Sequence, residues 1–144
     1  MQNRRDFIKK SCTLCMSIAG LGVLSSQLSS CAPLPIYKGE VSNGMIAVPV
    51  SSFTEKSNIV IVRNAQMEFD IAIVKNSASD YTALEMKCTH QANPLTATKM
   101  GLFCSAHGSS FDLKGNVTKE PASSPLKKYK TEISNTSVFI NIKS

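Results

Sequence analysis

Short apolar runs recur between residues 45 and 142, and most of them are four to eight residues long. They are rich in β-branched and aromatic side chains, and Asn, Ser, Gly and Pro separate them, which is typical of strands joined by turns. The runs cover residues 45–50, 58–63, 69–75, 81–87, 101–103, 110–113, 129–133 and 137–142. No window of a dozen residues in this part carries a helical stripe. The pattern therefore predicts an all-β fold, a small antiparallel sandwich or barrel.

The first 30 residues have a different pattern, which is typical of a targeting segment. The chain resembles the bacterial twin-arginine export signal at residues 3–9, where a paired Arg is followed by Asp, Phe, Ile and Lys. Residues 11–28 are weakly apolar and rich in Ser and Gly, and this run is shorter and more polar than a spanning helix of about 20 residues requires. The segment ends in Leu28-Ser29-Ser30-Cys31, which resembles the lipobox of bacterial lipoproteins.

Two interpretations of this segment remain open. In the first, residues 1–30 are a cleaved twin-arginine signal and the thiol of Cys31 carries a diacylglycerol, so that several acyl chains anchor the protein stably. In the second, the signal stays uncleaved as a transmembrane anchor and Cys31 is incidental. Both place the folded part on the periplasmic side of a bacterial membrane. Twin-arginine export carries folded cargo, which suits a protein that receives its cofactor before export.

Residues 31–44 are predicted to be a lipidated tether, and residues 45–144 the folded domain. The tether contains two Pro and two Gly and has no periodic pattern. The remaining stretch of roughly 100 residues is long enough for one modest hydrophobic core.

The positive charge of the chain is concentrated in its targeting segment. The whole chain has 16 basic and 10 acidic residues, whereas residues 31–144 have 12 and 9. These remaining charges are scattered and do not alternate with aromatic side chains, and the cluster Lys127-Lys128-Tyr129-Lys130 is no more than an exposed strand end. We therefore expect no nucleic-acid partner.

Two short loops of the predicted domain contain both histidines of the chain and two of its five cysteines. Cys88 and His90 lie in the first loop, and Cys104 and His107 lie in the second. Two thiolates and two imidazoles are enough to ligate a metal. The residues alone leave three possibilities: a structural zinc, a disulfide between the two cysteines with incidental histidines, or an iron–sulfur cluster with thiolates on one iron and imidazoles on the other.

The pattern of residues 84–129 is similar to that of the Rieske 2Fe-2S proteins. The resemblance rests on the two ligand pairs and on the following further positions: Gly108, Phe111-Asp112, Gly115, Pro121-Ala122, Pro125-Leu126 and Tyr129. It implies one 2Fe-2S cluster, with Cys88 and Cys104 on the inner iron and His90 and His107 on the outer iron. It also implies that Pro121 belongs to a loop that covers the cluster.

Mixed ligation of this kind raises the reduction potential, because neutral imidazoles replace two anionic thiolates. It also allows electron transfer to be coupled to proton transfer at the imidazoles. The quinol-oxidising branch of the family has a disulfide across the cluster, and here the equivalent positions are Asn93 and Ala106. Ser109 could donate a hydrogen bond to a cluster sulfide or serve only the loop backbone. The quinol-oxidising branch has a Tyr at the position of Phe111, and the hydroxyl of that Tyr reaches a ligand thiolate, whereas Phe111 has no such donor. We therefore expect a potential below that of the respiratory quinol oxidisers.

The function implied by the resemblance is electron transfer without a catalytic residue. The chain is too short, and has too few histidines, to include the mononuclear iron domain of the family's oxygenases. The first hypothesis is a membrane-tethered electron carrier whose partner is a cytochrome c or a quinol-linked or molybdenum enzyme. The alternative is a subunit of a cytochrome bc-type or molybdenum oxidoreductase complex. A zinc-stapled binding module is the third.

Overall fold

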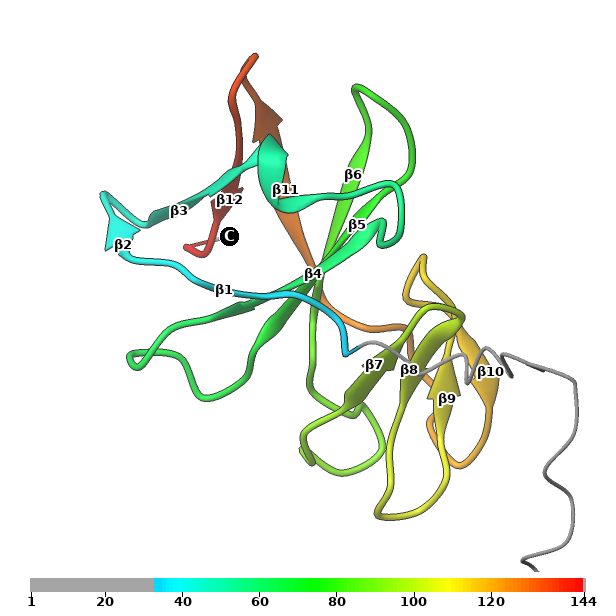
Figure 1. Ribbon diagram of the computed structural model, residues 1–144. Helices are drawn as coiled ribbons and strands as arrows, with labels where there is room; N and C mark the ends of the chain where they lie inside the picture. Colours follow the sequence, from blue (N-terminus) through cyan, green and yellow to red (C-terminus); the bar gives the residue numbers. More distant parts are fainter. Residues whose placement is uncertain (1–32, 144) are drawn as a thin grey trace, which may run out of the picture. The chain divides into compact units, whose positions relative to one another are not determined.

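The computed structural model describes residues 33–143, which belong to one compact unit. The predicted signal, the lipobox and Cys31 lie outside the described residues. Among residues 33–143 the helical structure is limited to a 3-10 turn, Val50–Ser52, and no helix in this range has the length and apolar character needed to cross a membrane. The rest of the regular structure is strand, so the predicted all-β class is confirmed (Figure 1).

Eight strands form one curled sheet with the order β1-β4-β5-β6-β11-β12-β3-β2. Their bounds are β1 Ile36–Lys38, β2 Val41–Ser42, β3 Met45–Pro49, β4 Ile59–Arg63, β5 Ile71–Lys75, β6 Tyr81–Glu85, β11 Lys128–Ile133 and β12 Ser137–Asn141. Neighbours pair antiparallel except β1 and β4, which are parallel. We call these strands and the segments that join them, residues 33–85 and 128–143, the scaffold.

The central strands β4 and β5 are buried on both faces, which explains their nearly continuous apolar sequences. Val60 and Val62 face one core together with Ile71 and Ile73, and β3 and β12 complete that core with side chains such as Ile46. The alternate residues of β4 and β5 face a second core. That core contains Ile59, Ile61, Ala72 and Val74 of the scaffold and continues into residues 86–126.

Residues 86–127 are inserted between β6 and β11, and we call them the insert. The insert contains a second sheet with the order β10-β9-β8-β7, which Figure 1 shows as a separate small sheet beside the large one. Its strands are short: β7 Thr96–Thr98, β8 Gly101–Phe103, β9 Ser110–Phe111 and β10 Val117–Lys119. Leu102 and Phe111 of this sheet pack against Leu84 of the scaffold in the second core. The insert is therefore attached to the scaffold by apolar burial.

The predicted tether, residues 31–44, includes residues that belong to the large sheet. The segment 31–44 was expected to have no regular structure, but β1 pairs with β4 and β2 pairs with β3. The turn between β2 and β3 contains Asn43 and Gly44, both with positive φ (53° and 80°), which is the Asn-Gly geometry that favours a tight hairpin. The strand β1 is held by backbone bonds, including one of 2.9 Å from the Ile61 amide to the Pro35 carbonyl. The folded sheet therefore begins at Ile36.

The eight predicted strands are all present, with ends that differ by up to two residues. Leu84 and Met86 lie in the same core, as their alternation predicted. The strands β7 and β10 were not predicted. They have three residues each and few large apolar side chains, so neither shows a period of two.

Candidate metal centre

The first predicted ligand loop leaves the end of β6. A hydrogen bond of 2.9 Å from the Leu95 amide to the Met86 carbonyl closes its base, and the Cys88 amide donates to the Asn93 carbonyl at 2.8 Å. The backbone of Asn93 therefore helps to close the loop around Cys88. The loop holds Cys88 inside and carries His90 outward, since Cys88 is buried and His90 is exposed.

The second ligand loop joins β8 to β9. The Cys104 amide donates to the Ser109 carbonyl, and the Gly108 amide donates to the Cys104 carbonyl, both at 2.9 Å. Gly108 has a φ of +82°, which side chains with a Cβ adopt at a cost, so glycine suits the turn directly after His107. As in the first loop, the cysteine is buried and the histidine is exposed.

The two loops bring the thiols of Cys88 and Cys104 together beneath the surface. Both cysteines are free thiols, 2% and 0% exposed, and a hydrogen bond joins their side chains. Burial raises the pKa of the Cys88 thiol. Hydrogen bonds from the His90 and Gln91 amides and from the Cys104 and Ser109 side chains outweigh burial, so the pKa is lowered overall. The site therefore eases loss of the thiol proton at Cys88, and the thiolate is the form that binds metal.

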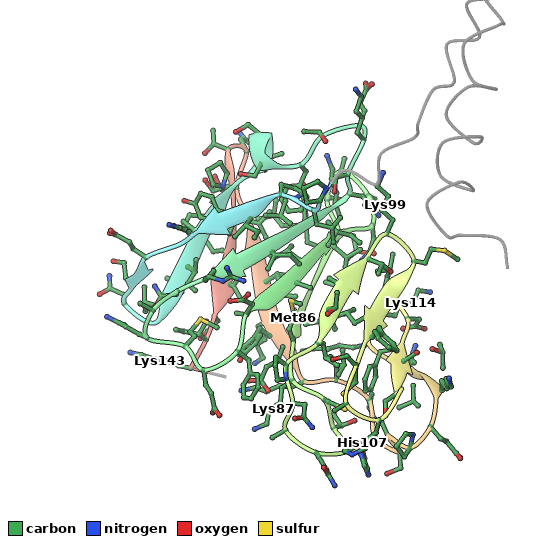
Figure 2. All side chains as sticks on the ribbon, turned by 60° about the horizontal axis from the view of Figure 1, so that its bottom comes forward. Met86, Lys87, Lys99, His107, Lys114 and Lys143 are labelled. Atoms are coloured by element: carbon green, nitrogen blue, oxygen red, sulfur yellow. The ribbon has the colours of Figure 1, made fainter. Side chains whose placement is uncertain are left out.

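The two imidazoles form a second pair at the surface. The ring centroids of His90 and His107 are 5.0 Å apart, and the rings are perpendicular. Figure 2 shows His107 at the outer end of the insert, away from the large sheet. Buried sulfur donors thus lie beneath exposed nitrogen donors, which is the separation that the resemblance implied.

A third loop, residues 120–126, is pinned to both ligand loops. The Ala122 amide donates to the Ser109 hydroxyl at 3.0 Å, and the Thr89 hydroxyl donates to the Ser124 carbonyl at 2.7 Å. Pro121, which follows a cis peptide bond, is exposed on this loop. The predicted covering loop therefore contacts both ligand segments. The role of Thr89 was not foreseen, because its partner lies 35 residues further along the chain.

The remaining predicted residues of the site support the loops. Ser109 is 0% exposed, and its hydroxyl both accepts from Ala122 and donates to the Cys88 sulfur. Phe111 is 1% exposed and is a core anchor. The Asp112 carboxylate accepts two backbone N–H bonds of 2.8 Å, from Lys114 and Asn116, so it orders the turn rather than acting as an acid.

The donor set fits a binuclear iron–sulfur cluster. A 2Fe-2S centre of mixed ligation takes two thiolates on one iron and two imidazoles on the other, and the structure presents these donors as two separate pairs. No three His, Cys, Asp or Glu side chains within residues 33–143 gather in a way that could hold one ion. The two cysteines are thiols here and not the disulfide of the second alternative.

Comparisons with known proteins agree with this geometry. The chain is 34% identical over 79 residues to the cytochrome b6-f complex iron-sulfur subunit of Chlorobaculum thiosulfatiphilum, a match that covers 53% of this chain and 43% of the relative. The chain thus spans less than half of that curated relative.

Two solved structures are also similar. A chain in the complex of reduced oxygenase and oxidized ferredoxin in carbazole 1,9a-dioxygenase matches at 20% identity with a TM-score of 0.54, over 70% of this chain and 95% of that chain, which shows a shared fold. The cyanobacterial plasma membrane Rieske protein PetC3 from Synechocystis PCC 6803 matches at 22% identity with a TM-score of 0.47, over 67% of this chain and 85% of that chain.

The model of the Rieske [2Fe-2S] domain family matches residues 44–130, which is more than half of the chain and includes the whole insert. This family binds a 2Fe-2S cluster. The chain therefore belongs to the Rieske [2Fe-2S] family.

Proposed function

We propose that this chain is a membrane-tethered periplasmic electron carrier whose cluster is held by Cys88, Cys104, His90 and His107. The observation that carries the ligand assignment is the pair of hydrogen-bonded buried thiols beneath a pair of exposed imidazoles. The 2Fe-2S cluster supplies the uptake and release of single electrons. The chain's own residues hold it, exclude water from its sulfur side and present its other side to a partner.

The thiol side of the site is shielded from water. Cys88 and Cys104 are at most 2% exposed, and Ser109 beside them is fully buried. The loop 120–126 is tied to Ser109 and to Thr89, so it limits access of water from that direction. Burial and hydrogen bonds to sulfur are the features by which a protein tunes a cluster potential.

The imidazole side is the route for electrons. His90 and His107 are both exposed and lie next to each other, so a partner that touches this surface would contact the two imidazoles that would hold the outer iron. Both histidines of the chain are then ligands. No imidazole remains for acid–base catalysis, and we therefore propose a carrier and not a catalyst.

The membrane tether rests on the sequence motifs at residues 3–9 and 28–31. A cleaved signal and a lipidated Cys31 would leave only four residues before the first strand at Ile36. Such a short connection would keep the domain close to the membrane surface, since each residue spans at most about 3.5 Å. Electron exchange would then take place with partners in or near the membrane.

A second candidate function is a subunit of a cytochrome bc-type complex, or of a molybdenum oxidoreductase complex. The similarity to a cytochrome b6-f complex iron-sulfur subunit favours the former. The positions of the family's bridging cysteines are occupied by Asn93 and Ala106, which favours the independent carrier. Purification in mild detergent separates the two, because a subunit will co-purify with its complex in fixed ratio and a carrier will not.

Cell fractionation of the full chain and of Cys31→Ser tests the tether. The full chain is expected in the membrane fraction, and the variant is expected in the soluble periplasmic fraction with its cluster absorption unchanged. A variant that stays in the membrane would favour the uncleaved transmembrane anchor. Ser30→Ala is a matched control at the adjacent position and should remain membrane-bound.

A further inference from the structure

The net charge of the folded part lies entirely in the insert. Residues 33–143 contain 12 basic and 9 acidic side chains. The scaffold contains seven of each sign and is neutral, whereas the insert contains five Lys and two acidic residues. A count over the whole chain hides this difference, because the targeting segment contributes its own positive charge.

One lysine of the insert lies beside the residue that follows His107, and a second directly precedes Cys88. The ammonium group of Lys119 is 3.8 Å from the position that a Cβ on Gly108 would take, directly after His107. Lys87 directly precedes Cys88, and Figure 2 shows Lys87 and His107 at the same end of the molecule. The Lys87 ammonium is 5.2 Å from the centroid of the Phe69 ring, which holds it near the junction with the scaffold. We call Lys87 and Lys119 the basic pair.

The two acidic residues of the insert do not cancel its five lysines. The Asp112 carboxylate is committed to the turn that it orders, with three hydrogen bonds from Lys114 and Asn116. Glu120 is exposed next to Lys119, and the excess of three positive charges already includes it. The insert therefore keeps a net charge of +3, and the basic pair lies toward its histidine end.

The same surface is shaped for close approach by another protein. Small exposed side chains lie in the same loops as the imidazoles, namely Ala92 and Ala106, and Pro125 is exposed in the covering loop. A small, largely apolar contact area with a charged rim is typical of transient redox complexes, in which charge steers the encounter. A lipid surface would meet the same lysines but contains no redox centre for the electron.

Building on the proposed function, we infer that the histidine end of the insert docks an acidic surface of its redox partner protein, with the basic pair as its electrostatic guide. The steering raises the encounter rate and weakens as salt screens the charges. Contact at Ala92, Ala106 and the imidazoles then places the partner's redox centre near the outer iron.

Oxidation of the reduced full chain by two inorganic complexes of opposite charge tests the inference. Hexacyanoferrate(III) is anionic and tris(1,10-phenanthroline)cobalt(III) is cationic, and each accepts one electron from the cluster with no bond made or broken. The double variant Lys87→Glu/Lys119→Glu should lower the anionic-to-cationic rate ratio about tenfold at low ionic strength, and salt should reduce the difference.

The matched control is Lys56→Glu/Lys75→Glu, which changes the net charge equally. Lys75 pairs with Tyr81 at the start of β6, and Lys56 lies three residues from Phe53, whose ring contacts Tyr81. Both are therefore at the opposite end of β6, roughly 16 Å of strand from the ligand loop. The control should change the ratio less than twofold, and equal effects of the two double variants would overturn the inference.

An acidic and a basic soluble cytochrome of similar potential extend the test to proteins. The acidic cytochrome should be reduced faster, and the basic-pair variant should lose this preference. If that variant instead loses binding to phosphatidylglycerol vesicles while its cytochrome rates stay unchanged, the basic pair serves a membrane and the inference is wrong. The absorption of the cluster is recorded for every variant, because a chain without it would contradict the proposed function and not the docking alone.

Discussion

The scaffold and the insert are stabilised in different ways. The scaffold has five-residue strands such as β4 and β5, with cores of Ile and Val on both of their faces. The insert has strands of two or three residues, and its loops depend on individual hydrogen bonds, such as that of Ser109 with the Ala122 amide. Burial stabilises both regions, and the loops of the insert depend in addition on individual hydrogen bonds of their turns and on the proposed cluster. The difference predicts that the two regions respond separately to substitution.

Loss of a thiolate should have the largest effect and should be confined to the insert. Cys88→Ser removes one of the two buried sulfur donors, so we expect complete loss of the 2Fe-2S absorption and electron spin resonance signals. Amide hydrogen exchange should then speed up in residues 86–127 while β4 and β5 stay protected. Cys31→Ser is the control and should retain the cluster. Equal loss of protection in both regions would mean that they fold as one unit.

Loss of a core side chain of the scaffold should weaken the whole domain without changing the cluster. Ile73 is fully buried in the core that the insert does not reach, and Ile73→Ala should reduce the free energy of unfolding by about 2–5 kcal/mol. Urea denaturation measures this change, and the cluster signal per folded molecule should be unaltered. Ile133→Ala, at a position that is 42% exposed, should cost far less. A changed cluster spectrum in the Ile73 variant would show that the regions are coupled.

Loss of the Ser109 hydroxyl should alter both the insert and the electron affinity. Ser109→Ala leaves the buried Ala122 amide without its acceptor, which costs about 1–3 kcal/mol, and it removes a hydrogen bond to the Cys88 sulfur. Since such bonds favour the reduced cluster, the midpoint potential should fall by about 50 mV for a bond of roughly 1 kcal/mol. Redox titration measures the shift. Ser105→Ala in the same loop is the control, and an unchanged potential would remove Ser109 from the tuning of the cluster.

The smallest effect is expected at the junction, where Tyr129 of β11 donates a hydrogen bond of 2.7 Å to Glu85. Burial and the Glu85 carboxylate raise the pKa of Tyr129 well above its usual value. Above about pH 10 the unfolded chain loses the phenol proton that the folded chain keeps, so stability should fall as pH rises. Tyr129→Phe should cost about 1 kcal/mol at neutral pH and should flatten this alkaline loss. Parallel stability curves for the two proteins would contradict the assignment.

The sequence predicted the scaffold well where burial produces a repeating pattern. The runs at residues 58–63 and 69–75 are strands because their side chains fill two cores. The hairpin at Asn43-Gly44 was missed although its turn signal is present, because the flanking prolines and glycines suggested a tether. The edge strand β1 is held by its backbone, and backbone pairing leaves little trace in the order of side chains.

The candidate ligands Cys88, His90, Cys104 and His107 were predicted from two compact motifs, and the family resemblance implied that they hold a cluster. The motifs do not show which distant segments of the chain contact each other. The bond from Thr89 to the Ser124 carbonyl and the approach of Lys119 to Gly108 depend on how the loops fold over one another. The difference in net charge between the insert and the scaffold likewise becomes visible only when the boundaries of the insert are known.

The most direct test of the account is the metal and sulfide content of the intact chain, measured together with its electron spin resonance spectrum after reduction. The account predicts about two irons and two acid-labile sulfides per chain, a brown colour, and a signal of mixed thiolate and imidazole ligation that is lost in His107→Ala. A colourless protein with one zinc per chain, or a 2Fe-2S signal that survives the substitution unchanged, would contradict it.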